Sequence, residues 1–198
     1  AVFHLAAVSD INKVKSIPVK TIETNILGTT YLLEAARKAK IDRFIFAGSV
    51  YSYAKAGNIY TSSKTASESI IKNYHLLYGQ NFTILRFATA YGPKNREVDA
   101  ISIFVKRALK NSDLIIHGNG KQKRNFIYVE DLAAGAMLAL SKKTKNKIIT
   151  LASKENITIV NLAKTIIKIT KSNSKIIYNK KKQRFDDYNS KHSYDKNE

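Results

Sequence analysis

The chain has no cysteine in its 198 residues, and its histidines are few and scattered. Without thiols it can form neither a disulfide framework nor a thiolate metal site, and it has no cysteine nucleophile. The four histidines, His4, His75, His117 and His192, show no ligand spacing with acidic residues. We therefore expect no metal centre.

Long apolar runs are also missing. No stretch approaches the length that is needed to span a bilayer. The first residues have the pattern of a buried strand and carry no basic leader. These features predict a cytoplasmic protein with no membrane partner.

Acidic residues are scarce, since 15 Asp and Glu stand against 34 Lys and Arg, and the formal net charge is +19. Such a charge suits a nucleic acid, an anionic membrane surface or an anionic small substrate. Lysine dominates, however, and is spread over the whole chain among many Asn and Ile residues. No helix-turn-helix, zinc-finger or aromatic RNA-binding signature accompanies it. We favour biased lysine usage and expect no nucleic-acid partner.

Short apolar runs alternate with amphipathic stretches, which is typical of an α/β fold with a largely parallel sheet. The runs predict strands at residues 2–6, 44–47, 83–87, 114–117, 125–129, 148–151 and 175–178. The amphipathic stretches predict helices at residues 19–37, 63–78, 101–109, 130–141 and 158–170. A breaker at Tyr91-Gly92-Pro93 marks a boundary, so residues 1–88 and 89–198 are expected to form two regions. Gly118-Asn119-Gly120 predicts a hairpin turn.

Tyr60 and Lys64 are four residues apart at the start of a predicted helix, so both side chains can lie on one face. An ammonium beside a phenol favours the phenolate, which makes Tyr60 a plausible acid and base at neutral pH. The same spacing occurs elsewhere in this lysine-rich chain, and context singles out this pair. An amphipathic helix follows it, and a strand that ends in Gly48-Ser49 precedes it. Ser49 at that strand end could donate a hydrogen bond to a reacting oxygen.

Six segments occur together in one order along the chain. They are Val2-Phe3-His4-Leu5-Ala6-Ala7, Asn25-Ile26-Leu27-Gly28-Thr29, Phe44-Ile45-Phe46-Ala47-Gly48-Ser49, Tyr60 to Lys64, Leu85 to Pro93, and Gly118 to Asp131. In this combination the chain resembles the extended short-chain dehydrogenases, specifically the NAD-dependent epimerase/dehydratase family and most of all its UDP-glucose 4-epimerases. The resemblance implies a partial Rossmann-type parallel sheet flanked by helices, with a smaller α/β substrate-binding domain.

The resemblance also assigns roles to residues. Tyr60 would be the base that removes a proton from a sugar hydroxyl, Lys64 would hold the nicotinamide ribose, and Ser49 would bind the same hydroxyl. Contacts to the cofactor NAD are implied for Leu5, Ala6, Ala7, Asn25, Tyr60, Lys64, Phe87 and Ala88. Contacts to the substrate, a nucleotide sugar with a UDP-sugar favoured, are implied for Thr89, His117, Arg124, Arg184 and Asp187. A homodimer of the full-length protein is compatible with the resemblance.

Some of these positions have simpler explanations that the sequence leaves open. Asn25 could bridge backbone groups, His4 could be a packed strand residue, and Arg184 could belong to a basic tail that includes residues 180–184. Arg124 could be one exposed cation among many.

Three departures from the family pattern are visible in the sequence. It has no glycine-rich dinucleotide loop and no ribose-binding acid, so we expect it to begin after them. Only eleven positions separate Ser49 from Tyr60, about half the family interval. Thr89 stands where sugar-nucleotide epimerases commonly have asparagine.

The residues after Ser49 favour one reaction within the family. Sugar dehydratases typically follow the catalytic Ser or Thr with an Asp-Glu pair, whereas Val50-Tyr51 follows here. We therefore expect epimerisation through transient hydride transfer. An NAD(P)-dependent reductase or dehydratase, or a non-catalytic relative that acts as a binding protein, are the alternatives.

Overall fold

The structure is a computed structural model, and it describes residues 1–53, 58–95 and 99–179. The contacts within the chain divide it into two compact units. The described residues of the first unit lie within 1–88 and 130–151, and those of the second lie within 89–129 and 152–179.

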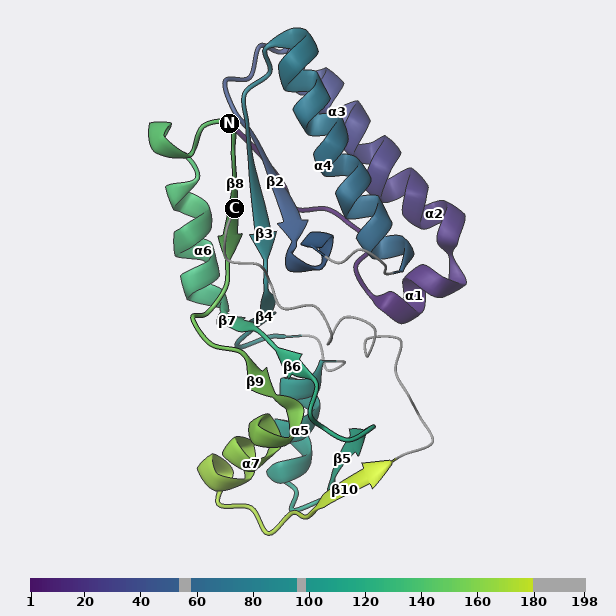
Figure 1. The fold of residues 1–198 in the computed structure, drawn as a ribbon, viewed down its shortest axis with the longest axis vertical. Helices are drawn as coiled ribbons and strands as arrows, with labels where there is room; N and C mark the ends of the chain where they lie inside the picture. Colours follow the sequence, from purple (N-terminus) through teal and green to yellow (C-terminus); the bar gives the residue numbers. More distant parts are fainter. Residues whose placement is uncertain (54–57, 96–98, 180–198) are drawn as a thin grey trace. The chain divides into compact units, whose positions relative to one another are not determined.

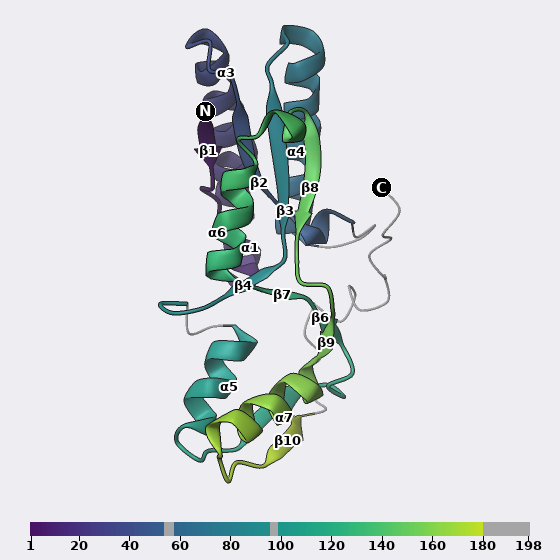
Figure 2. The same ribbon diagram turned by 90° about the vertical axis from the view of Figure 1, so that its left-hand side faces the viewer.

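The first unit is built on a four-stranded parallel sheet with the order β1-β2-β3-β8 (Figure 2). The strands are β1 (Val2–His4), β2 (Phe44–Ser49), β3 (Phe82–Phe87) and β8 (Lys147–Leu151). Every residue of β2 is buried, as expected of a central strand that is covered on both faces. Because the strands are parallel, their carboxyl ends meet at one edge, the edge where such sheets bind ligands.

Helices cover both faces of this sheet. The chain enters α1 (Ile11–Ser16) and then a continuous helical stretch of α2 (Pro18–Ile22), the π-helical turn η1 (Glu23–Leu27) and α3 (Gly28–Lys38). The others are the 3₁₀ turn η2 (Val50–Tyr53), α4 (Ile59–Tyr78), α6 (Val129–Leu138) and the 3₁₀ turn η3 (Lys142–Thr144). Figure 1 shows α3 and α4 on one face of the sheet and α6 on the other.

Alternation along the strands produces the two apolar layers of this unit. Phe44 and Phe46 of β2 pack with Leu33 of α3 and Ile71 of α4. The intervening Ile45 faces the opposite layer, where it joins a smaller cluster below α6. Full burial of each such side chain contributes roughly 1.5–3 kcal/mol, so the layer under α3 and α4 provides much of the stability of this unit.

The second unit combines short strand pairs with two helices. Its strands are β4 (Thr89–Tyr91), β5 (Leu114–His117), β6 (Lys123–Arg124), β7 (Phe126–Tyr128), β9 (Ile157–Thr158) and β10 (Ile176–Asn179). The pairs β4–β7 and β5–β10 are parallel, and β6–β9 is antiparallel. The helices α5 (Ala100–Ala108) and α7 (Ile159–Thr170) pack against β5, with Phe104, Leu114 and Leu162 in the core.

The predicted fold class is confirmed, whereas some local predictions differ from the structure. Residues 130–151 lie in the first unit, not with the rest of 89–198, because β8 pairs with β3. The predicted hairpin at Gly118-Asn119-Gly120 is wrong, since β5 and β6 pair with β10 and β9 and not with each other. The turn itself exists, and Gly118 and Gly120 adopt positive φ of 79° and 71° in it.

No helix in the described ranges is long and apolar enough to cross a membrane. No group of three or more His, Asp or Glu side chains in this part of the chain could hold a metal ion.

Candidate active site

The start of α4 presents the candidate catalytic pair. Asn58 caps the helix, and its side-chain oxygen accepts a hydrogen bond of 3.0 Å from the Thr61 amide. Helix α4 therefore begins at Ile59, four residues earlier than the pattern predicts, and Tyr60 and Lys64 both lie within it. The Lys64 ammonium is 5.9 Å from the centroid of the Tyr60 ring. The predicted proximity of phenol and ammonium is thus present in the structure.

Lys64 is a buried cation, with only 3% of its surface exposed. Its ammonium donates a hydrogen bond of 2.7 Å to the Ala47 carbonyl of β2 and lies 4.6 Å from the centroid of the Phe46 ring. Burial disfavours the charged form and lowers the pKa of Lys64 to about 8, against the opposing attraction of Glu68. The ring contact offsets part of that cost, at about 0.5–2 kcal/mol.

Ser49 is the last residue of β2, on the ligand-binding edge of the sheet. It is 5% exposed, and its hydroxyl oxygen accepts a hydrogen bond of 3.2 Å from the Tyr51 amide. That bond fixes the first turn of η2 directly after the strand. Residues 54–57, between η2 and α4, lie outside the described ranges. Ser49 and Lys64 are held near the same strand end, because Lys64 bonds to Ala47, two residues before Ser49.

Asn25, predicted to contact the cofactor, bridges two segments of the first unit. Its side-chain oxygen accepts from the Val8 amide at 2.8 Å, and its amide nitrogen donates to the Val8 carbonyl at 3.1 Å and to the Ser63 hydroxyl at 2.9 Å. Ser63 in turn donates to the Tyr60 carbonyl at 2.8 Å. Asn25 is 2% exposed and lies in η1, whose π-helical geometry is frequent at functional sites. It therefore ties the loop after β1 to the turn of α4 that carries Tyr60.

His4 is a packed strand residue. Its Nε2 lies 2.8 Å from the Thr29 hydroxyl, and its ring packs against Phe44 and Phe46. The Thr29 hydroxyl also donates to the Asn25 carbonyl at 2.6 Å, so it accepts from His4, whose Nε2 carries the proton. Burial, and then the charge of Lys64, lower the pKa of His4 to about 4.

The loop after β1 contains three residues predicted to line the dinucleotide. Leu5 is 61% exposed, Ala6 is exposed and Ala7 is half-buried. Exposed apolar groups directly beyond a parallel strand suit the face of a flat ligand. Phe87 and Ala88, at the end of β3, are instead packed, and the Ala88 amide donates to the Leu151 carbonyl at 2.9 Å.

The predicted substrate contacts that can be described lie in the second unit. Thr89 pairs with Phe126, and its amide donates to the Asn125 carbonyl at 3.2 Å, so Thr89 lies close to the segment that carries Arg124. Arg124 lies in β6 and is half-buried, and one guanidinium nitrogen donates to the Lys123 carbonyl at 3.0 Å. His117 ends β5. The other two predictions, Arg184 and Asp187, fall outside the described residues.

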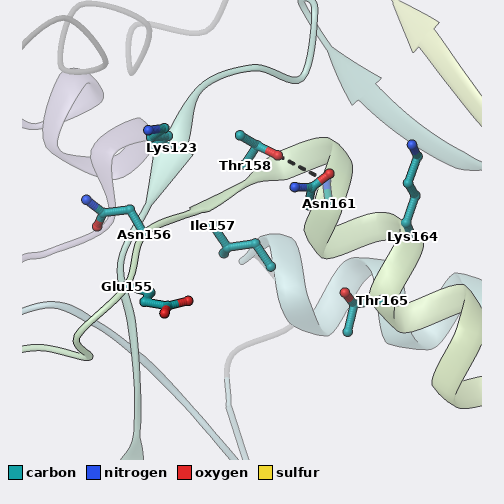
Figure 3. Close-up of a pocket in the computed structure, with 8 residues that line it drawn as sticks. All are labelled: Lys123, Glu155, Asn156, Ile157, Thr158, Asn161, Lys164 and Thr165. Carbon is teal, nitrogen blue, oxygen red and sulfur yellow. Dashed lines mark hydrogen bonds between the residues drawn. The ribbon is translucent and has the colours of Figure 1, made fainter.

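An open cleft of about 570 Å³ also lies in the second unit (Figure 3). It is lined by Lys123, Glu155, Asn156, Ile157, Thr158, Asn161, Lys164 and Thr165. Thr158 caps α7 by accepting a hydrogen bond of 3.2 Å from the Asn161 amide. None of the predicted site residues lines this cleft.

A buried ion pair that is not predicted from the sequence lies one helical turn beyond Lys64. Glu68 of α4 pairs with Arg86 of β3 at 2.8 Å, with side-chain exposures of 3% and 12%. The sequence places Glu68 four residues after Lys64 on one helix face, but no local pattern points to Arg86 as its partner.

Comparison with known proteins decides the family. A sequence model of the NAD-dependent epimerase/dehydratase family matches residues 1–152. The chain belongs to this family. That match covers the β1 loop, Ser49, Tyr60 and Lys64, and the segment that carries Arg124. The predicted family resemblance is confirmed.

Curated relatives in this family carry out more than one reaction. A UDP-N-acetyl-alpha-D-glucosaminuronate decarboxylase of Bacillus cytotoxicus is 32% identical over 198 aligned positions, which cover 89% of this chain and 61% of that protein. A putative UDP-glucose 4-epimerase of Methanocaldococcus jannaschii is 36% identical over 170 positions, covering 77% of this chain and 55% of that protein. The chain spans about half to three-fifths of the length of these two relatives.

Solved structures of family members have the same fold. A UDP-glucose 4-epimerase of Thermotoga maritima, solved with UDP-glucose, matches with a TM-score of 0.85 and 26% identity over 92% of this chain and 64% of that one. A UDP-glucuronic acid 4-epimerase of Bacillus cereus, solved with UDP-glucuronic acid and NAD, matches with a TM-score of 0.80 and 28% identity over 89% of this chain and 61% of that one.

The residues of this family member fit the ribose end of NAD. Lys64 has three ammonium hydrogens, and the Ala47 carbonyl is the only acceptor for them within the described ranges. A buried ammonium with donors to spare suits a ribose diol, and the exposed Leu5 and Ala6 suit an apolar ring face. The sequence has no glycine-rich loop of the kind that receives a pyrophosphate.

Proposed function

We propose that the protein containing this chain catalyses NAD-dependent epimerisation of a nucleotide sugar, with a UDP-sugar as the favoured substrate. The observation that carries the proposal is the buried Lys64 beside Tyr60 at the carboxyl edge of a parallel sheet. A cation at this position stabilises a phenolate, so Tyr60 can accept a proton at neutral pH.

The residues divide the work as follows. Tyr60 takes the proton of a sugar hydroxyl and later returns it, while Lys64 holds the ribose and stabilises the phenolate. Ser49, at the end of β2, donates a hydrogen bond to the same sugar oxygen. NAD held there would supply the hydride chemistry, which is the reversible oxidation of the sugar carbon with return of the hydride to the opposite face.

The residues proposed to bind the substrate diphosphate and sugar belong to the second unit. Arg124 would bind the diphosphate, since its planar donors match phosphate oxygens, and the neighbouring Thr89 would meet the sugar. Val50-Tyr51 after Ser49 supports epimerisation, because the Asp-Glu pair typical of dehydratases is absent from the sequence at this point.

The product identifies the reaction. The full-length protein with NAD and UDP-glucose should give UDP-galactose, with no loss of water or carbon dioxide, as followed by proton NMR. A 4-keto-6-deoxy sugar would instead indicate a dehydratase. A UDP-pentose formed from UDP-glucuronic acid would indicate a decarboxylase. One relative is named as a decarboxylase, with UDP-N-acetyl-alpha-D-glucosaminuronate as its substrate.

A second candidate is a non-catalytic binding protein. The short interval of eleven positions between Ser49 and Tyr60, about half the family interval, favours it. The reading frame upstream of Ala1 separates the two functions. A glycine-rich βαβ unit encoded there favours the enzyme, and its absence favours the binding protein.

A further inference from the structure

The Glu68–Arg86 ion pair connects α4 to the end of the sheet. Arg86 donates to both oxygens of Glu68, at 2.8 Å from Nη2 and at 3.2 Å and 3.3 Å from Nε. Such a two-point contact fixes orientation as well as distance. Glu68 lies one helical turn beyond Lys64, so the pair fixes the turn of α4 that carries the candidate site.

The backbone of β2 makes room for this carboxylate. A Cβ at Gly48 would lie 2.8 Å from Oε1 of Glu68, closer than real Cβ contacts come. Gly48 is in register with Arg86 and directly precedes Ser49. The carboxylate is therefore held against the strand segment that ends in the candidate serine.

The same arginine also holds the turn after Ser49. Its guanidinium carbon lies 4.2 Å from the centroid of the Tyr53 ring, at the end of η2. The Tyr53 hydroxyl lies 2.7 Å from the Thr150 hydroxyl of β8. The ion pair thus joins α4 and β3 and contacts β2 and η2. Of these elements, β2 carries Ser49, and α4 carries Tyr60 and Lys64.

Stability alone explains this pair poorly. Two charges lose their hydration on burial, and apolar residues of the same volume are often as stabilising or more so. A buried pair that contacts each element of the site therefore points to a role in the site.

We propose that Glu68, held by Arg86 against Gly48, is a positioning residue that sets the place and the charge of Lys64. This inference rests on the proposed function, in which the Lys64 ammonium supports Tyr60. The groups around Lys64 are consistent with it. His4 on β1 is neutral, Phe46 on β2 presents its ring, Tyr60 lies one turn before, and Glu68 is the neighbouring anion. Glu68 opposes the effect of burial on the pKa of Lys64.

The test is Glu68→Gln in the full-length protein, which keeps the side-chain shape and removes the charge. We expect the Lys64 titration to move down by about one pH unit or more. It is measured by NMR of ¹³Cε-labelled lysine without NAD or substrate, with Lys64→Arg for assignment. The alkaline limb of kcat should move by the same amount, so that kcat at pH 8 falls about fivefold or more, while KM changes less than twofold. An unchanged Lys64 titration would overturn the inference.

A matched control is Glu34→Gln on α3. Glu34 makes a two-point ion pair with Arg37 on the surface, at 2.7 Å and 2.8 Å. Its removal should leave both the Lys64 titration and the alkaline limb unchanged. An equal shift of the Lys64 titration in this variant would show that the loss of any carboxylate has the same effect, and it would overturn the inference.

A double variant covers the case in which Glu68→Gln does not fold. Glu68→Leu with Arg86→Leu replaces the pair by apolar groups and should fold. We expect Lys64 in the double variant to titrate at a lower pH than in the wild type. A titration at the wild-type pH would show that the pair is only structural. The NMR readout needs no activity, so it decides this inference even if the proposed reaction is not found.

Discussion

At the residue scale, His4 and Lys64 share one buried environment with a single positive charge. The pKa of Lys64 falls to about 8 and that of His4 to about 4, each mainly because of burial. Near neutral pH the lysine is therefore charged and the imidazole neutral. The neutral imidazole donates a hydrogen bond to the Thr29 hydroxyl, which in turn donates one to the Asn25 carbonyl.

This difference predicts how stability depends on pH. Below pH 6.5 His4 becomes protonated in the unfolded chain, whereas in the folded chain it stays neutral down to about pH 4. The free energy of unfolding should therefore fall as the pH drops from 6.5 to 4, by up to about 3 kcal/mol from this group. Urea unfolding of the wild type and of His4→Gln between pH 7 and pH 4.5 measures it. The variant should lose this part of the dependence, and parallel curves would contradict the assignment.

At the element scale, the π-helical turn η1 explains why Asn25 reaches both the β1 loop and α4. The sequence predicts one helix over residues 19–37, and the structure has a helical stretch there that widens at 23–27. The apolar spacing cannot reveal such a widening, because one extra residue in a turn leaves most of the apolar face in place. The short helix α1 was missed, since its six residues are too few to establish a period.

Replacing Asn25 tests the role of this turn. Asn25→Ala removes three side-chain hydrogen bonds, and the half-buried backbone of Val8 and the buried Ser63 hydroxyl lose those partners. We expect a loss of about 2–4 kcal/mol in the free energy of unfolding, from urea titration. Thr30→Val, which removes one hydroxyl bond to the Ile26 carbonyl of the same helical stretch, should cost less than about 1 kcal/mol. Equal losses in the two variants would show that Asn25 does not bridge these segments.

At the scale of the whole molecule, the sequence predicts most strands and helices and the pair Tyr60 and Lys64. It does not predict which distant segments come into contact. Parallel strands and their helices follow from alternating apolar runs, and Tyr60 with Lys64 follows from helical spacing. Long-range partners do not, since neither the return of residues 130–151 to the first unit nor the contact of Arg86 with Glu68 is visible in local patterns. Both depend on which strands become neighbours.

Tyr60 is the residue on which the proposed reaction depends most, because it moves the proton. Tyr60→Phe in the full-length protein removes one hydroxyl and keeps the ring. Steady-state conversion of UDP-glucose to UDP-galactose at pH 7.5, with the melting temperature measured alongside, tests it most directly. We predict that kcat falls at least a hundredfold, as expected for loss of general acid and base catalysis, while the melting temperature changes little. A variant that folds and retains more than about one tenth of the wild-type kcat would contradict this role for Tyr60.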